Sequence, residues 1–171
     1  MSELATSFVS GFAHPLHGAD HAVAMVAVGI WGALAGGRSI RLWPIAFVAA
    51  MLVGFATAAA GIAVPRVEPV IVLSIIVLGL LVAFASAAPL WLGAAIIGLF
   101  AFFHGHVHGT ETAAASLVAY ATGLAIATGT LHVAGIAICR RTSGPIGNVA
   151  LRTAGAVTAF GGVVAMAVML T

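Results

Sequence analysis

The sequence predicts an all-α integral membrane protein, a polytopic bundle of six transmembrane helices, and two observations support this fold class. First, 63% of the 171 residues are hydrophobic and 6% are charged, whereas about a quarter of the residues in an average soluble domain are charged. A chain this small leaves much of its side-chain surface facing outward, so that surface has to face lipid. Second, the apolar residues form runs of roughly 20, the helix length that crosses a bilayer.

Polar or proline-containing breaks separate these runs into six spans, which form a single transmembrane domain, residues 1–171. Glycines and Arg38 separate the first span from the second, Pro69 opens the third and Pro89 opens the fourth. Glu111 ends the fourth span and Arg140 ends the fifth. The amino-terminal residues lack the basic segment of a signal peptide, so the first apolar run is expected to belong to the fold. The expected spans cover about residues 15–36, 42–64, 69–86, 89–109, 112–139 and 149–170.

Most arginines gather on one side of the predicted bundle. The arginine-rich side contains Arg38, Arg41, Arg140, Arg141 and Arg152, whereas the opposite side contains only Arg66. Because positive charge is retained in the cytoplasm, both termini are expected outside, and we expect the protein in the bacterial inner (cell) membrane. Three of the four acids, Glu3, Glu68 and Glu111, fall on the outer side. An acidic mouth attracts cations, which favours traffic toward the cytoplasm.

A first cluster of candidate metal ligands lies where the first span begins, in the sequence HPLHGADH. On a continuous helix, at 100° per residue, His14, His17 and His21 lie within about 60° of one another. All three imidazoles would then share one helix face, with Asp20 on its flank. Imidazoles and a carboxylate in this arrangement form a ligand set for a metal ion.

A second cluster closes the fourth span, in the sequence FHGHVHGTE. If the helix continues, His104, His108 and Glu111 share one face and His106 points away. The two glycines make an unwound helix end an equal alternative, in which backbone carbonyls join the site. By the topology above, both clusters reach the same membrane face.

Six of the seven histidines fall in these two windows, and each window also holds an acid. The plain alternative is that they are interfacial residues in contact with water. Because ionisable residues inside a membrane are costly unless they are paired or used, their clustering favours a functional site. Imidazole and carboxylate ligands suit nickel, cobalt, zinc and copper(II), whereas copper(I) prefers sulfur, which both clusters lack.

Two further residues are candidates for the same path. His132 lies well along the fifth span, where a single imidazole is either a hydrogen-bonded packing residue or a second station for the ion. Glu68 lies in a short outer loop, where it is either a solvated loop charge or part of the mouth. Cys139 and the scattered methionines are interpreted as packing residues.

The two clusters resemble the paired motifs of the HupE/UreJ family of nickel and cobalt permeases, HPxxGxDH and FHGxAHGxE. One position departs from the pattern, Val107, where the family usually has alanine. The similarity covers nearly the whole chain and implies six spans with an outside amino terminus, which family members commonly reach through a cleaved signal peptide. Glu68 is a looser match, His104 falls within the second motif, and His17 and His106 occupy variable positions. The resemblance assigns functional roles to His14, Asp20, His21, His108 and Glu111.

We therefore expect a permease that moves Ni²⁺ or Co²⁺ toward the cytoplasm through a site near the outer face, without catalysing a reaction. The expected partners are the lipid bilayer and the divalent metal ion, and a homo-oligomer is left open. No nucleic acid is expected, because basic residues are few. No cofactor is expected either, since the metal is bound as the transported substrate. The expected metal ligands are His14, His17, Asp20, His21, His104, His108 and Glu111, with Glu68, His106 and His132 as secondary candidates.

Two other functions fit the same residues. Histidines and an acid on helices can hold a catalytic zinc with a bound water, which would make the protein an intramembrane metalloenzyme. Alternatively, the histidines carry protons in a proton-relay or structural subunit of a membrane complex. Nickel and cobalt accept the same ligands, so the sequence leaves that choice open, together with the choice between a channel and alternating access.

Overall fold

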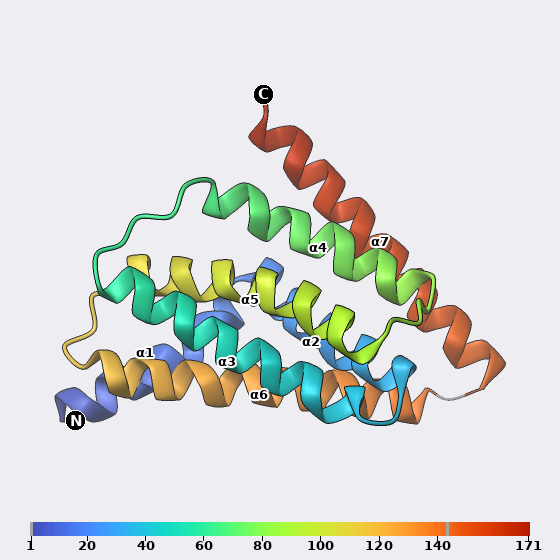
Figure 1. The fold of residues 1–171 in the computed structure, drawn as a ribbon, viewed down its shortest axis with the longest axis horizontal. Coiled ribbons are helices and arrows are strands. Elements are labelled where there is room, and N and C mark those ends of the chain that lie inside the picture. Colours follow the sequence, from blue (N-terminus) through green and yellow to red (C-terminus); the bar gives the residue numbers. More distant parts are fainter. Residues whose placement is uncertain (1, 143) are drawn as a thin grey trace.

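The fold is all-α, as predicted (Figure 1). The computed structural model describes residues 2–142 and 144–171, and these residues form helices and connecting loops without any strand. The helices are α1 (Glu3–His17), α2 (Ala19–Ala35), α3 (Ser39–Ala59), α4 (Val67–Ala83), α5 (Leu90–Glu111), α6 (Leu117–Arg141) and α7 (Pro145–Met169).

Four of these helices, α3, α5, α6 and α7, are long and apolar enough to cross a membrane. Helices α1 and α2 meet the same criteria only as a pair, which is bent by 83°, and they give a fifth candidate if the pair is one span. Helix α4 is a shorter apolar helix of 17 residues, about 25 Å long at 1.5 Å per residue. The described residues therefore contain four or five candidate spans, and the predicted number of six is not confirmed.

The region of the first predicted span differs from the expected continuous helix. Helical structure already begins at Glu3, where the Ser2 hydroxyl accepts a hydrogen bond from the Ala5 amide. The helix is then interrupted at Gly18, whose extended backbone both ends α1 and begins α2. Our expectation of three histidines on one continuous helix face is therefore wrong, because His17 lies before the bend and His21 after it.

Glycines let the central helices pack backbone against backbone. Gly105 of α5 lies against the backbone of Met51 in α3, so a side chain there would overlap the α3 carbonyl. Gly11 of α1 lies in the same way against the backbone of Tyr120 in α6. Such small residues are what allow membrane helices to approach closely. As a result α5 is held against α3 and α1 against α6, and contacts of α2 with α3 and α6 join the two pairs.

Helices α4 and α7 form a separate pair along one side of the bundle (Figure 1). Gly79 of α4 faces Gly155 and Ala159 of α7, and the two helices run in opposite directions. Many large apolar side chains of α7 are exposed, among them Val157 and Phe160. This pattern is typical of a helix whose outer face lies against lipid.

The end of the bundle opposite the histidine clusters is closed by aromatic residues. Trp31 and Trp43 are fully buried, and their ring centroids lie 4.2 Å apart. Their indole N–H groups donate to the carbonyls of Ser86 (2.8 Å) and Leu90 (2.9 Å), which tie the connection between α4 and α5 to α2 and α3. The side chain of Arg152 donates to the last turn of α4 at the same end. Five of the six arginines lie at or near this end of the bundle, where α3 begins and α6 ends (Figure 1).

Candidate metal-binding site

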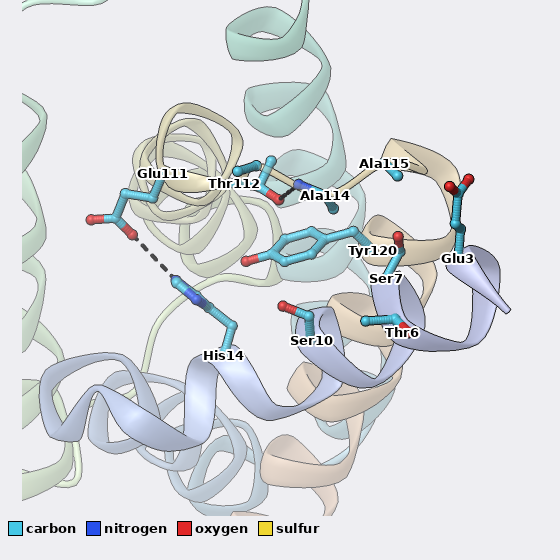
Figure 2. A pocket seen from close by; sticks show the side chains of 11 residues that line it. Glu3, Thr6, Ser7, Ser10, His14, Glu111, Thr112, Ala114, Ala115 and Tyr120 are labelled. Atoms are coloured by element: carbon cyan, nitrogen blue, oxygen red, sulfur yellow. Dashed lines mark hydrogen bonds and ion pairs between the residues drawn. The ribbon is translucent and has the colours of Figure 1, made fainter. Parts of the chain in front are cut away.

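The structure brings the two sequence clusters together at one end of the bundle. His14 lies in the last turn of α1 and Glu111 is the last residue of α5, yet the His14 Nε2 and Glu111 Oε2 atoms are 3.2 Å apart. Figure 2 shows these two side chains pointing toward each other, with the ring of Tyr120 beside them. Helices far apart in the chain thus contribute donors to one place.

His14, His108 and Glu111 form a group that could hold one metal ion. Each offers one ligand atom, and these atoms all lie within 4.8 Å of one another. The His108 side chain is buried, that of His14 is 34% exposed and that of Glu111 is 48% exposed. Two imidazoles and a carboxylate suit nickel, cobalt or zinc. An ion bound here would touch solvent on the Glu111 side and protein on the His108 side.

His21 extends this group inward from the first turn of α2. Its ring centroid lies 4.7 Å from that of His108 and 5.2 Å from that of His104. The Asp20 carboxylate lies 2.9 Å from His21 Nδ1 and can accept its N–H. In that tautomer the lone pair is on Nε2, which is buried and has no hydrogen-bond partner among the described residues. A carboxylate that orients an imidazole in this way is typical of histidine metal ligands.

His104 lies one turn deeper than His108 on α5 and is fully buried. Its Nδ1 donates to the Phe100 carbonyl at 2.9 Å, which leaves the lone pair on Nε2. Within the described part of the chain, neither that nitrogen nor the two ring nitrogens of His108 has a partner. Buried polar atoms are normally hydrogen-bonded, so unbonded nitrogens gathered in one place indicate a ligand site.

These contacts connect six residues in order from the surface to the interior, and we call this set the histidine line. Two helix segments, α1–α2 and α5, contribute its members alternately, so that no single helix contains the whole path. The histidine line consists of Glu111, His14, His108, His21 with its partner Asp20, and His104.

An open polar cleft of about 430 Å³ leads to the surface end of the line. Its walls carry the hydroxyl groups of Ser7, Ser10 and Thr112, and Glu3 lies at its rim (Figure 2). The described lining also contains Tyr120, whose ring centroid lies 6.0 Å from that of His14. The cleft therefore supplies an open approach, lined by hydroxyl groups, to the first candidate ligands.

The other candidate ligands lie away from this group. His17 is exposed, and Glu68 is exposed in the first turn of α4. His106 is buried, but its Nε2 lies 2.9 Å from the Ile62 carbonyl, which ties α5 to the connection after α3. His132 is buried deeper in the bundle, with its ring 4.9 Å from that of Phe47. None of these four belongs to the group of three that the described residues form.

Sequence reasoning missed two aromatic residues beside the histidines. Tyr120 contacts His14, and Phe47 lies in ring contact with both His104 and His132. Tyr120 is the sole tyrosine of the chain, which was an available signal. Phe47 is one of nine phenylalanines in an apolar sequence, so composition gives no reason to single it out.

Comparisons with known proteins point to one family. The family model described as "HupE / UreJ protein" matches residues 1–165. A curated relative, "Protein HupE" of Rhizobium leguminosarum bv. viciae, is 43% identical over 155 residues, which are 90% of this chain and 81% of the relative. No solved structure matches the chain. The family resemblance seen in the two motifs is thereby confirmed over nearly the full length.

Proposed function

Because the chain belongs to the HupE/UreJ family, we propose that it is a membrane permease that takes up Ni²⁺ or Co²⁺ along the histidine line. One observation carries the proposal: His14 and Glu111, from different helices, meet the buried His108 at the foot of a polar cleft. The imidazoles of His21 and His104 continue from there into the bundle. A family resemblance alone would not supply this path.

The first step of uptake is capture at Glu111, His14 and His108. The half-exposed Glu111 carboxylate attracts the divalent cation from the cleft, as negative charge at a mouth does. Protein ligands then replace part of the water shell of the ion, with His14 and His108 supplying nitrogen. Because Glu111 still touches solvent, the ion loses its water in stages and is never left without ligands.

The second step is transfer from His108 to His21 and His104. Neighbouring rings lie 4.7 and 5.2 Å apart between centroids, so a small rotation of either ring brings two nitrogens to one ion. The ion can then gain its next ligand before it leaves the previous one. Several sites of moderate strength in series favour flux, because no single site holds the ion too tightly to release it. Asp20 supports this step by fixing the tautomer of His21.

We also propose six membrane spans, with the bent α1–α2 pair as the first span and α4 as a short one. Support comes from the antiparallel packing of α4 on α7, which is itself a candidate span. With the arginine-rich end in the cytoplasm, both termini are outside and the histidine line opens to the exterior. In this orientation transport runs inward.

Transport without catalysis explains the site better than a zinc hydrolase does. A catalytic zinc keeps an open position for water beside a substrate cleft. Here the unbonded nitrogens of His21 and His104 continue away from the cleft into the helices, where a substrate of a hydrolase has no access. We therefore propose that the metal ion is the substrate of transport, bound by protein side chains and requiring no cofactor.

The proposal is tested by metal uptake into sealed liposomes that contain the purified full-length chain and an internal metal-sensitive dye. Saturable entry of Ni²⁺ or Co²⁺ without entry of Mg²⁺ is the expected result. His21→Ala and Glu111→Ala are expected to abolish it, whereas His17→Ala, which changes an exposed histidine outside the line, should leave uptake close to the wild type. Folded protein that gives no flux, or flux that both first variants leave unchanged, would contradict the proposal.

The same liposomes separate the two alternative functions. A proton-relay subunit would dissipate an imposed pH gradient in the absence of metal, and Glu111→Ala would slow that dissipation. An enzyme would bind zinc tightly without releasing it inside the vesicle. Metal-dependent entry with an intact pH gradient in metal-free buffer is the pattern that our proposal predicts.

A further inference from the structure

His132 is a buried histidine that the histidine line does not include. It lies in the middle of α6 and is 1% exposed. Within the described residues, neither its Nδ1 nor its Nε2 has a hydrogen-bond partner. A neutral imidazole carries one donor and one acceptor, and burying both unbonded is unfavourable. A packing role would be filled better by an apolar side chain such as leucine.

Phe47 of α3 connects His132 to the inner end of the histidine line. Its ring centroid lies 5.8 Å from that of His104 and 4.9 Å from that of His132. All three side chains are buried. A rotation of the Phe47 ring would therefore open or close the space between the two imidazoles, so this ring is placed to control passage from His104 to His132.

Two further donor atoms lie one helical turn from His132 and Phe47. Thr128 precedes His132 by one turn of α6, and Met51 follows Phe47 by one turn of α3, so each pair shares a helix face. The Thr128 hydroxyl and the Met51 sulfur are 3.5 Å apart, and both residues are fully buried. A hydroxyl, a thioether and an imidazole thus occupy neighbouring positions in the space between α3 and α6. Imidazole is the strongest ligand of the three for nickel or cobalt.

The depth of His132 places it well beyond the capture site. Tyr120, beside His14, and His132 lie on the same helix, and their separation along it corresponds to about 18 Å at 1.5 Å per residue. The buried rings of Trp31 and Trp43, tilted by 34° to each other, then close the far end of the bundle. An ion that reached His104 would need another ligand before that closure, and His132 is the buried histidine on that side of Phe47 in the described fold.

We propose that His132 is an inner metal station, occupied by Ni²⁺ or Co²⁺ after the ion leaves His104 and passes the Phe47 ring. This inference rests on the proposed permease function and adds a second binding position to it. The ion moves by ligand exchange: its bond to the His104 nitrogen breaks as it leaves that site, and a bond to the His132 nitrogen forms once it has passed the Phe47 ring. No bond within the protein is made or broken.

A thiol placed at the station reports directly on contact with the ion. In purified full-length protein that carries Cys139→Ser, the added substitution His132→Cys is expected to give a thiolate-to-metal charge-transfer absorption when Co²⁺ is added. Val133→Cys, on the exposed face of the same helix, is the matched control and should give none. If His132→Cys does not fold, Thr128→Cys offers a thiol one turn away on the same face. A folded variant that binds Co²⁺ without this absorption overturns the proposal.

Transport and binding measurements separate failure of this inference from failure of the permease function. His132→Leu is expected to lose uptake by more than tenfold and to keep Co²⁺ binding at Glu111, His14 and His108. If His132 had only a structural role, His132→Leu would either lose its fold or, if folded, keep wild-type uptake. If wild-type protein itself gives no uptake, the permease function fails. If wild type transports and His132→Leu transports equally well, only the inner station is refuted.

Discussion

The Asp20 carboxylate lies 2.9 Å from His21 Nδ1. The two residues are neighbours in the sequence and lie just after the bend at Gly18. This contact assigns the proton of His21 to Nδ1 and leaves Nε2 free to bind an ion. Because the His21 ring touches both His108 and His104, its orientation controls the middle of the histidine line.

Asp20→Asn is expected to weaken metal binding without unfolding the protein. The amide has no charge and can present its NH₂ group to Nδ1, which would favour the wrong tautomer. Loss of such an orienting partner typically lowers metal affinity about 10- to 100-fold. Calorimetric titration of the purified variant with Co²⁺ measures the change. Glu3→Gln, at the rim of the cleft, is the control, and an equal loss there would mean that general charge and not orientation is responsible.

Gly18→Ala is expected to reduce uptake while the helices stay intact. A Cβ at this position would lie 2.8 Å from Asp20 Oδ1 and 3.0 Å from His21 Nδ1. The extended backbone of Gly18 is accessible to alanine, so the side chains of Asp20 and His21 move and the backbone does not. Circular dichroism should therefore match the wild type, and liposome uptake should fall. Wild-type uptake by this variant would show that the Asp20–His21 contact is dispensable.

Gly105→Ala should destabilise the bundle itself. The new methyl group would overlap the backbone of Met51 in α3, and the two helices would have to separate. Overpacking of this kind costs typically about 1–3 kcal/mol or more. Thermal unfolding in detergent is expected at a lower temperature than for the wild type. Gly129→Ala, where a Cβ meets nothing within 4 Å, is the matched control and should unfold at the same temperature as the wild type.

Glu111→Gln is expected to raise the metal concentration needed for half-maximal uptake more than it lowers the maximal rate. Glu111 is the half-exposed member of the capture group, so its charge acts mainly on arrival and first binding of the cation. Uptake measured over a range of Ni²⁺ or Co²⁺ concentrations separates the two effects. A lowered maximal rate at unchanged half-saturation would place Glu111 in a later step.

Much of this fold was predictable because membrane helices are encoded by long apolar runs. The all-α class, the family and the residues of both histidine clusters follow from the sequence. The bend at Gly18 does not, because glycine occurs within membrane helices as well as at their breaks. The length of α4 was also not predictable to within a turn, since Phe84 and Ala85 are as apolar as the helix that precedes them.

Parts of the candidate site depend on features that the periodicity of a single helix does not encode. His14, His108 and Glu111 meet because α1 and α5 both reach the same end of the bundle, which topology suggested. The exposure of His17 depends on the bend, and the bond from His106 to the Ile62 carbonyl depends on a loop. Neither could be read from helical periodicity. The contact of Phe47 with His132 could not be predicted either, because it depends on how α3 packs against α6.

X-ray absorption spectroscopy of Ni²⁺ bound to the purified wild-type chain tests the central claim most directly. The account predicts a first shell of nitrogen and oxygen with the multiple-scattering signature of at least two imidazoles and no thiolate sulfur, and a loss of imidazole scattering in a His14→Ala, His108→Ala double variant. A shell of water alone, a shell containing thiolate sulfur, or a spectrum that the double variant leaves unchanged would contradict it.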